Sequence, residues 1–266
     1  MSKILVVGTG GTIACVRQDN IRLDNPFKIL DSADFKGVSF DCVCPFSVLS
    51  ENMDIDLWQK LIDCLSAVDY EEYDGVIILH GSDTLVWTGA LLGNIFYDKS
   101  IVLVAADKPL EDESSNGAAN FQRAVEFILS SVKGVYISYN RLYTAVRTVS
   151  AGQNDEFLTA GRQFEPVKNP KLNRRNILVI NPYVNIDYSN YCLEGVDAVL
   201  HTMYHSATVP ENVKDFAEKC RGMNIPFYFV TSKSAAEYES TRGIENIIFN
   251  STLENAYARL LLTKRI

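Results

Sequence analysis

The sequence predicts an α/β protein with a doubly wound parallel sheet in its N-terminal domain and a smaller α/β domain after it. Short apolar runs of strand length alternate with longer segments of helical periodicity. These runs are apolar at nearly every position, which is typical of parallel strands that helices cover on both faces. A polar stretch at 161–175, with two prolines and five basic residues, interrupts the alternation. We therefore expect domains at 1–160 and 176–266, joined by a linker.

The expected first domain begins with a strand at 3–8 that ends at a glycine. Asp54 is expected to cap a helix over 54–67, because apolar residues recur there at near-helical spacing. Strands and helices then alternate along the chain. The next elements are a strand at 76–80, a helix at about 84–97, a strand at 101–106, a helix at about 117–131 and a strand at 135–139.

The expected second domain repeats this alternation on a smaller scale. A helix is expected to open at Pro210, because proline suits the first helical position. The other expected elements are strands at 177–181, 196–201 and 227–232 and a final helix at about 252–263.

Composition excludes several classes of function. The chain has 266 residues, 47% of them hydrophobic, which is enough for a sizeable core. A net charge of −8 without a basic run argues against binding to nucleic acid or to an anionic membrane. The apolar run at the N-terminus is too short for a secretory signal, and no run is long enough to span a bilayer. We expect a cytoplasmic protein with its six cysteines reduced.

No metal or cofactor is expected. The cysteines lack zinc spacing. His201 and His205 are four residues apart, a spacing that suits a metal on a helix. They follow an expected strand and have no acidic third ligand at a set spacing, so we do not assign them to a metal.

A glycine-rich turn, GTGGTIA at 8–14, follows the first expected strand. Such a turn between strand and helix can bind phosphate. The dinucleotide pattern requires a third glycine where Ile13 stands, and the P-loop requires a GK[ST] sequence, so neither fits. The turn does place the Thr12 hydroxyl at the edge of the sheet where open α/β sheets bind ligands. A tight turn without chemistry is the alternative.

Two more polar motifs precede expected helices. HGSDTL at 80–85 puts the Ser82 hydroxyl beside the Asp83 carboxylate at the end of a strand. At the mouth of a site, Asp83 would bind a substrate ammonium group or orient a hydroxyl. SENM at 50–53 precedes the helix at 54–67. Taken alone, each motif also fits an ordinary loop or helix cap.

In this order and spacing, the three motifs resemble those of the bacterial-type L-asparaginases, a family of asparaginase and glutaminase amidohydrolases; this chain would be a short member. GTGGTIA resembles the first threonine motif of the family, with Thr12 at the nucleophile position. HGSDTL resembles the HGTDT motif, with Ser82 replacing the second threonine and Asp83 matched. SENM resembles the loop that holds the substrate through Ser50 and Glu51. The resemblance is strong up to about residue 130 and weak after 175.

The resemblance implies hydrolysis of L-asparagine to L-aspartate and ammonia through an acyl-enzyme on Thr12. Ser82 and Asp83 would form a second hydroxyl–carboxylate pair, and a homodimer or homotetramer would be the functional form. The residues expected to bind the amino-acid substrate are Ser50, Glu51, Gly11, Gly81 and Asp83.

Two family residues have no counterpart in this chain. Residues 15–30 contain no tyrosine, and the family lysine falls at Arg147 or Ser150. Arginine stays protonated, so Arg147 would support negative charge rather than act as a base. Three outcomes are compatible with the sequence. Substitutes come from elsewhere in the fold, the enzyme acts weakly or on glutamine or another amide, or the chain binds an amino acid without turning it over.

Overall fold

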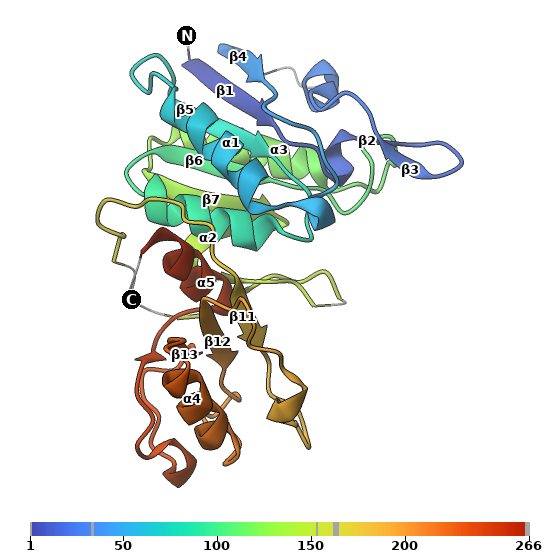
Figure 1. Cartoon of the computed structure of the whole chain (residues 1–266). Coiled ribbons are helices and arrows are strands. Elements are labelled where there is room, and N and C mark those ends of the chain that lie inside the picture. The colour runs from blue at the N-terminus through green and yellow to red at the C-terminus, as the bar shows by residue number, and fades with distance from the viewer. Residues whose placement is uncertain (1, 33–34, 153, 162–164, 264–266) are drawn as a thin grey trace. The chain divides into compact units, whose positions relative to one another are not determined.

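A computed structural model describes residues 2–32, 35–152, 154–161 and 165–263. The chain divides into two compact units, Met1–Thr159 and Ala160–Ile266 (Figure 1). Each unit contains its own sheet. The predicted α/β class with a doubly wound parallel sheet is confirmed. The domain limits at 160 and 175 stay predictions.

The first unit is built on a six-stranded sheet of order β4-β1-β5-β6-β7-β8. All its neighbouring strands are parallel except β8, which pairs antiparallel with β7. Its strands are β1 (Ser2–Gly8), β4 (Val38–Val43), β5 (Gly75–Leu79), β6 (Ser100–Val104), β7 (Gly134–Tyr139) and β8 (Arg141–Thr144). Strands β5 and β6 are buried along their whole length, as their apolar sequences predict.

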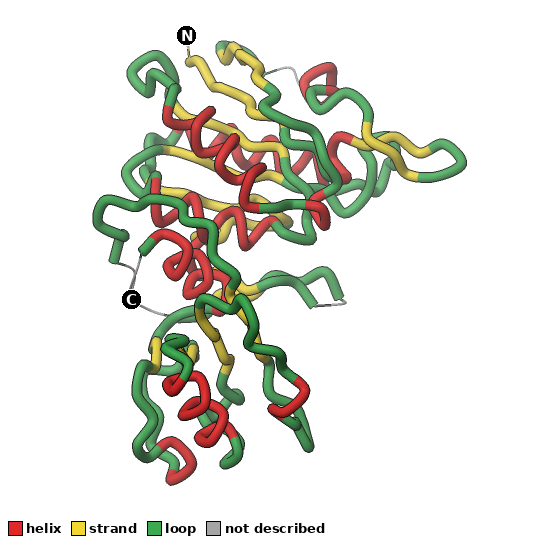
Figure 2. The backbone as a smooth tube through the Cα atoms, viewed as in Figure 1, coloured by secondary structure: helices red, strands yellow, loops and turns green. Residues whose placement is uncertain are grey.

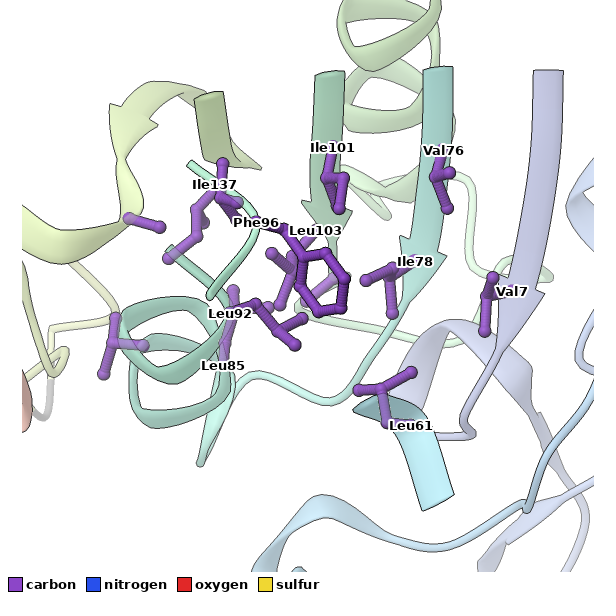
Figure 3. Packing of buried hydrophobic residues seen from close by; sticks show 14 of the residues in the cluster. Val7, Leu61, Val76, Ile78, Leu85, Leu92, Phe96, Ile101, Leu103 and Ile137 are labelled. Carbon is purple, nitrogen blue, oxygen red and sulfur yellow. The ribbon is translucent and has the colours of Figure 1, made fainter. Parts of the chain in front are cut away.

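Helices cover both faces of this sheet. They are α1 (Ile55–Ser66), α2 (Leu85–Ile95) and α3 (Gly117–Leu129). Helices α1 and α2 pack on one face, where Leu61 and Leu85 meet the strand residues Val7 and Ile78 (Figure 3). Helix α3 packs on the other face through Phe121 and neighbouring apolar residues. This layering explains why the strands carry apolar residues at successive positions.

The predicted cap of α1 is confirmed. The Leu57 amide donates to the Asp54 carboxylate at 2.8 Å, and α1 buries Trp58, Leu61 and Leu65. A side-chain acceptor at this position satisfies one of the backbone amides that lack a partner within the helix.

Several elements of the first unit were not predicted. They are short or half-exposed, so they lack a continuous apolar run: β2 (Cys15–Arg17), β3 (Ile21–Leu23), β4 and the pair β9 (Thr148–Val149) and β10 (Leu158–Thr159). Strands β2 and β3 form an antiparallel hairpin directly after the glycine-rich turn (Figure 2). The carboxylate of Glu111 accepts from the Arg17 amide at 3.2 Å and from Lys28 at 2.6 Å, which ties this hairpin region to the loop after β6.

The second unit has a four-stranded parallel sheet of order β11-β12-β13-β14. Its elements are β11 (Ile177–Ile180), β12 (Ala198–Thr202), α4 (Val213–Gly222), β13 (Phe227–Val230), β14 (Ile247–Ile248) and α5 (Leu253–Leu262). Helix α4 packs on the sheet through Val213, Phe216 and Cys220. Short 3₁₀ helices complete the two units: η1 (Thr12–Ala14), η2 (Lys28–Ser32), η3 (Ser50–Asn52), η4 (Ala145–Arg147), η5 (Tyr188–Asn190) and η6 (Glu239–Thr241).

Helix α4 corrects one prediction, because it begins at Val213 and not at Pro210. The Pro210 carbonyl accepts from the Val213 amide in a turn, and the Asn212 side chain donates to the Ile186 carbonyl at 3.0 Å. These bonds hold the segment before the helix in a turn. Residues 162–164 of the predicted linker lie outside the described residues. Further along it, the Lys171 and Asn173 amides donate to carbonyls at the end of α5.

Candidate active site

The candidate site lies at the carboxyl ends of β1 and β5, which are neighbours in the first sheet. From β1 the chain passes to β4 on one side, and from β5 it passes to β6 on the other. The direction of progress therefore reverses between β1 and β5. Open α/β sheets bind ligands outside the strand ends at this kind of reversal. Gly8 pairs with Leu79, so the turns that follow both strands start at the same level.

The first turn is fixed by backbone bonds to a segment that the sequence did not single out. The Val48 amide donates to the Thr9 carbonyl at 3.0 Å, and the Gly11 amide donates to the Val48 carbonyl at 2.9 Å. Gly10 and Gly11 have φ values of 105° and 76°, which favour glycine. The buried Thr9 hydroxyl donates to the Leu79 carbonyl at 2.8 Å. Thr9 thus has a structural bond, whereas Thr12 begins η1 and is half-buried.

The first and second turns touch through their backbones. A Cβ atom on Gly11 would lie 2.2 Å from both Cα and N of Gly81. Real Cβ contacts of this length do not occur, so the approach requires glycine at position 11. The glycines that the sequence placed in the substrate site are therefore neighbours in space.

The third motif packs against the second. A Cβ on Gly81 would lie 2.3 Å from Ser50 Oγ. The Ser50 hydroxyl donates to Asp83 at 3.4 Å, and the Thr84 hydroxyl donates to the Ser50 carbonyl at 2.9 Å. Ser50 is 3% exposed, whereas the Asp83 side chain is exposed and Ser82 is half-buried. The structure thus brings together the three motifs that the sequence singled out.

Glu51 is exposed and lies close enough to the first turn to affect Cys15. Burial raises the pKa of the Cys15 thiol, and the negative charge of Glu51 raises this pKa further. The thiol contacts the Gly11 carbonyl at 3.3 Å. The edge of the sheet therefore combines hydroxyl groups with two exposed carboxylates, those of Glu51 and Asp83. Such a set suits the ammonium group of an amino acid.

Arg147 lies half-buried in η4, which packs on α2 and β7. The helix allows this approach because Gly89 and Gly93 face η4; a Cβ on Gly93 would lie 2.6 Å from a Val146 methyl carbon. Helix α2 begins directly after the second motif, so η4 is positioned by that motif's own helix. Whether the guanidinium supports charge at the turns stays a prediction.

The histidines do not form a metal site. His201 is buried, with its imidazole 2.8 Å from the Tyr188 hydroxyl and 2.6 Å from the Thr202 carbonyl, whereas His205 is exposed. Among the described residues, no three His, Cys, Asp or Glu side chains gather in a metal-binding cluster.

Burial lowers the pKa of both His80 and His201 to about 4. An unfolded histidine titrates near 6.5, so the unfolded chain binds protons first as the pH falls. We expect the free energy of unfolding to decrease as the pH falls from about 6.5 towards 4. Urea denaturation at about pH 7 and about pH 5 measures this change. An unchanged unfolding free energy would show that neither imidazole is buried in neutral form.

The family model described as "Asparaginase, N-terminal" matches residues 3–169, more than half of the chain. The chain belongs to the asparaginase family of amidohydrolases. The family predicted from the three motifs is thereby confirmed, and the three motifs all fall within the matched residues.

Solved asparaginases have the same fold. The thermostable L-asparaginase from Thermococcus kodakarensis is similar over 97% of this chain and 92% of that chain, with a TM-score of 0.78 and 19% identity. L-asparaginase I from Vibrio cholerae O1 gives a TM-score of 0.76 and 22% identity over 98% of this chain and 92% of that chain.

A curated relative has a different name. This protein, a glutamyl-tRNA(Gln) amidotransferase subunit from Methanosarcina acetivorans, is 32% identical over 152 residues, which cover 52% of this chain. The match spans 34% of the length of that relative. In the described part of this asparaginase-family chain, every helix is too short or too polar to span a bilayer.

Proposed function

We propose that this asparaginase-family protein hydrolyses L-asparagine to L-aspartate and ammonia through an acyl-enzyme on Thr12. The contact of Gly11 with Gly81, and of Gly81 with Ser50, carries the proposal. It places the hydroxyls and carboxylates of three separate motifs at one edge of the sheet. Of the two threonines in the first turn, Thr9 is buried and bonded, so Thr12 is the available nucleophile.

In the proposed reaction, the Thr12 oxygen attacks the side-chain amide carbon of asparagine. A C–O bond forms, the C–N bond breaks, and the nitrogen leaves as ammonia with the proton from the hydroxyl. Water then attacks the ester, releases aspartate and restores the hydroxyl. Backbone N–H groups of the two turns would stabilise the oxyanion, because they are fixed before the reaction begins.

Exposed carboxylates would hold the α-ammonium group of the substrate. Asp83 and Glu51 flank the first turn from two different motifs, and Ser50 orients the Asp83 carboxylate through its hydroxyl. The backbones of Gly11 and Gly81 would form the floor of this subsite. The Ser82 hydroxyl, next to Asp83, would be the second hydroxyl of the site.

The experiment is ammonia release by the purified protein from L-asparagine and from L-glutamine. We expect ammonia from asparagine at a higher kcat/KM than from glutamine. No ammonia from either amide, combined with a melting temperature that L-aspartate still raises, would replace the enzyme by an amino-acid-binding protein. The lack of a lysine at 147 and 150 and of a tyrosine at 15–30 favours that alternative.

A preference for glutamine or a larger amide is the second alternative. The relative named as a subunit of a glutamyl-tRNA(Gln) amidotransferase favours it. A higher kcat/KM for glutamine would then replace asparagine as the proposed substrate and keep the acyl-enzyme. A homodimer or homotetramer in the cytoplasm is part of the proposal, and sedimentation of the purified protein measures the oligomeric state.

A further inference from the structure

His80 is a buried residue at the site for which the proposed reaction has no use. Its side chain is fully buried, and its amide donates to the Val104 carbonyl at 2.9 Å. Nδ1 of its imidazole lies 2.8 Å from the Gly81 carbonyl oxygen, and Nε2 lies 3.0 Å from the Thr88 hydroxyl. The Trp58 indole N–H donates to the same hydroxyl at 2.9 Å. Four residues from α1, α2 and the second turn thus form one continuous chain of hydrogen bonds.

The direction of every bond in this chain follows from the donors. An indole N–H only donates, and a carbonyl only accepts. Thr88 therefore accepts from Trp58 and gives its own proton to Nε2, so Nδ1 carries the hydrogen that reaches Gly81. Burial lowers the pKa of His80 to about 4, which keeps the imidazole neutral and this tautomer in place.

We propose that the Trp58–Thr88–His80 chain is a positioning device that fixes the Gly81–Ser82 peptide plane of the active site. In a trans peptide the C=O and the following N–H point in opposite directions. No cis peptide bond occurs in the described residues. With the Gly81 carbonyl held by His80, the Ser82 N–H points away from the buried imidazole. The orientation of Ser82 and Asp83 is thus set by helix α1 and helix α2.

Gly81 is the point where a small rotation has the largest consequence. It contacts Gly11 of the first turn and Ser50 of the third motif. A change in the Gly81–Ser82 peptide plane therefore moves the two turns and the Ser50–Asp83 bond together. A misplacement of about 1 Å in a reacting group lowers rates by about a hundredfold. The inference rests on the proposed function, because it concerns how that site is held.

Two amide substitutions of His80 separate positioning from simple core packing. The His80→Asn amide can occupy the place of Nδ1 and donate to Gly81, and it loses the contact with Thr88. The longer His80→Gln side chain reaches the place of Nε2 and loses the bond to Gly81. Both variants lose the ring, so we expect similar falls in melting temperature. A role in packing alone predicts equal effects on turnover as well.

We expect His80→Gln to lower kcat for the preferred amide by about a hundredfold, with KM changed by less than about threefold. His80→Asn should retain kcat within about tenfold of wild type. Thr88→Val should lower kcat and Thr88→Ser should restore it, because the serine keeps the hydroxyl between Trp58 and His80. Equal kcat in His80→Asn and His80→Gln, at matched melting temperatures, would overturn the inference.

An NMR measurement tests the device without turnover. In wild type, the ¹⁵N shifts of His80 should show a neutral imidazole protonated at Nδ1, and Thr88→Val should shift the Ser82 amide signal. A Ser82 signal that does not move in Thr88→Val overturns the inference even in an active enzyme. Absent ammonia release with the expected NMR result would overturn only the proposed function.

Discussion

Replacement of Thr12 by alanine is expected to abolish ammonia release from L-asparagine while the fold is retained. The hydroxyl is the proposed nucleophile, and its loss should lower kcat/KM by about 10⁴-fold or more. Thr12 is half-buried, and η1 is closed by the backbone bond from the Ala14 amide to the Gly11 carbonyl, which alanine keeps. The melting temperature should therefore stay close to wild type. Initial rates of ammonia release and thermal unfolding of both proteins measure the two quantities.

Two variants control this experiment. Thr12→Ser keeps a hydroxyl and should retain part of the activity, which would link the loss in Thr12→Ala to the nucleophile. Ser82→Ala removes the second hydroxyl of the site and should reduce activity less than Thr12→Ala does. A fully active Thr12→Ala protein would exclude Thr12 as the nucleophile. A larger loss in Ser82→Ala would reverse the two roles.

Gly11→Ala is expected to be the most damaging single-methyl change at the site. The new Cβ would lie 2.2 Å from the Gly81 backbone, which has no flexible side chain that could move aside. Gly11 also has φ 76° and ψ −179°, a region that is essentially restricted to glycine. We expect the free energy of unfolding to fall by about 3 kcal/mol or more, and activity to be lost with it. Urea denaturation measures the first effect.

Gly37→Ala is the matched control. Gly37 has φ 81°, and a Cβ there would have no atom within 4 Å. The substitution thus adds the backbone strain without the collision, and it should reduce stability by about 1 kcal/mol. Equal losses in Gly11→Ala and Gly37→Ala would mean that the contact between the two turns contributes nothing to stability.

The buried framework of the first unit was predictable because a fully buried strand leaves a continuous apolar run. β5 and β6 lie within one or two residues of their predicted limits for this reason. β4 was missed because half of its surface is exposed and its sequence mixes polar and apolar residues. The start of α4 was misplaced because proline fits both the first turn of a helix and the turn before it. Only the tertiary bond of Asn212 to Ile186 decides between them.

The meeting of the motifs at one edge followed from their positions at strand ends, because the carboxyl ends of parallel strands share an edge. The adjacency of β1 and β5 did not follow, since 66 residues lie between Gly8 and Gly75 and the strand order is a property of the whole sheet. Val48 was missed because it acts through its backbone, which leaves no mark on the residue type. Trp58 was visible only as an apolar helix position, and its indole bond to Thr88 requires the packing of α1 beside α2.

The covalent step is tested most directly by peptide mapping of the protein after rapid acid quenching during turnover of L-asparagine. An ester is stable in acid, so an acyl-enzyme would survive as an added aspartyl group on one peptide. The proposed mechanism predicts this group on Thr12, and its absence from the Thr12→Ala protein. An aspartyl group on Ser82 with Thr12 unmodified would contradict the mechanism.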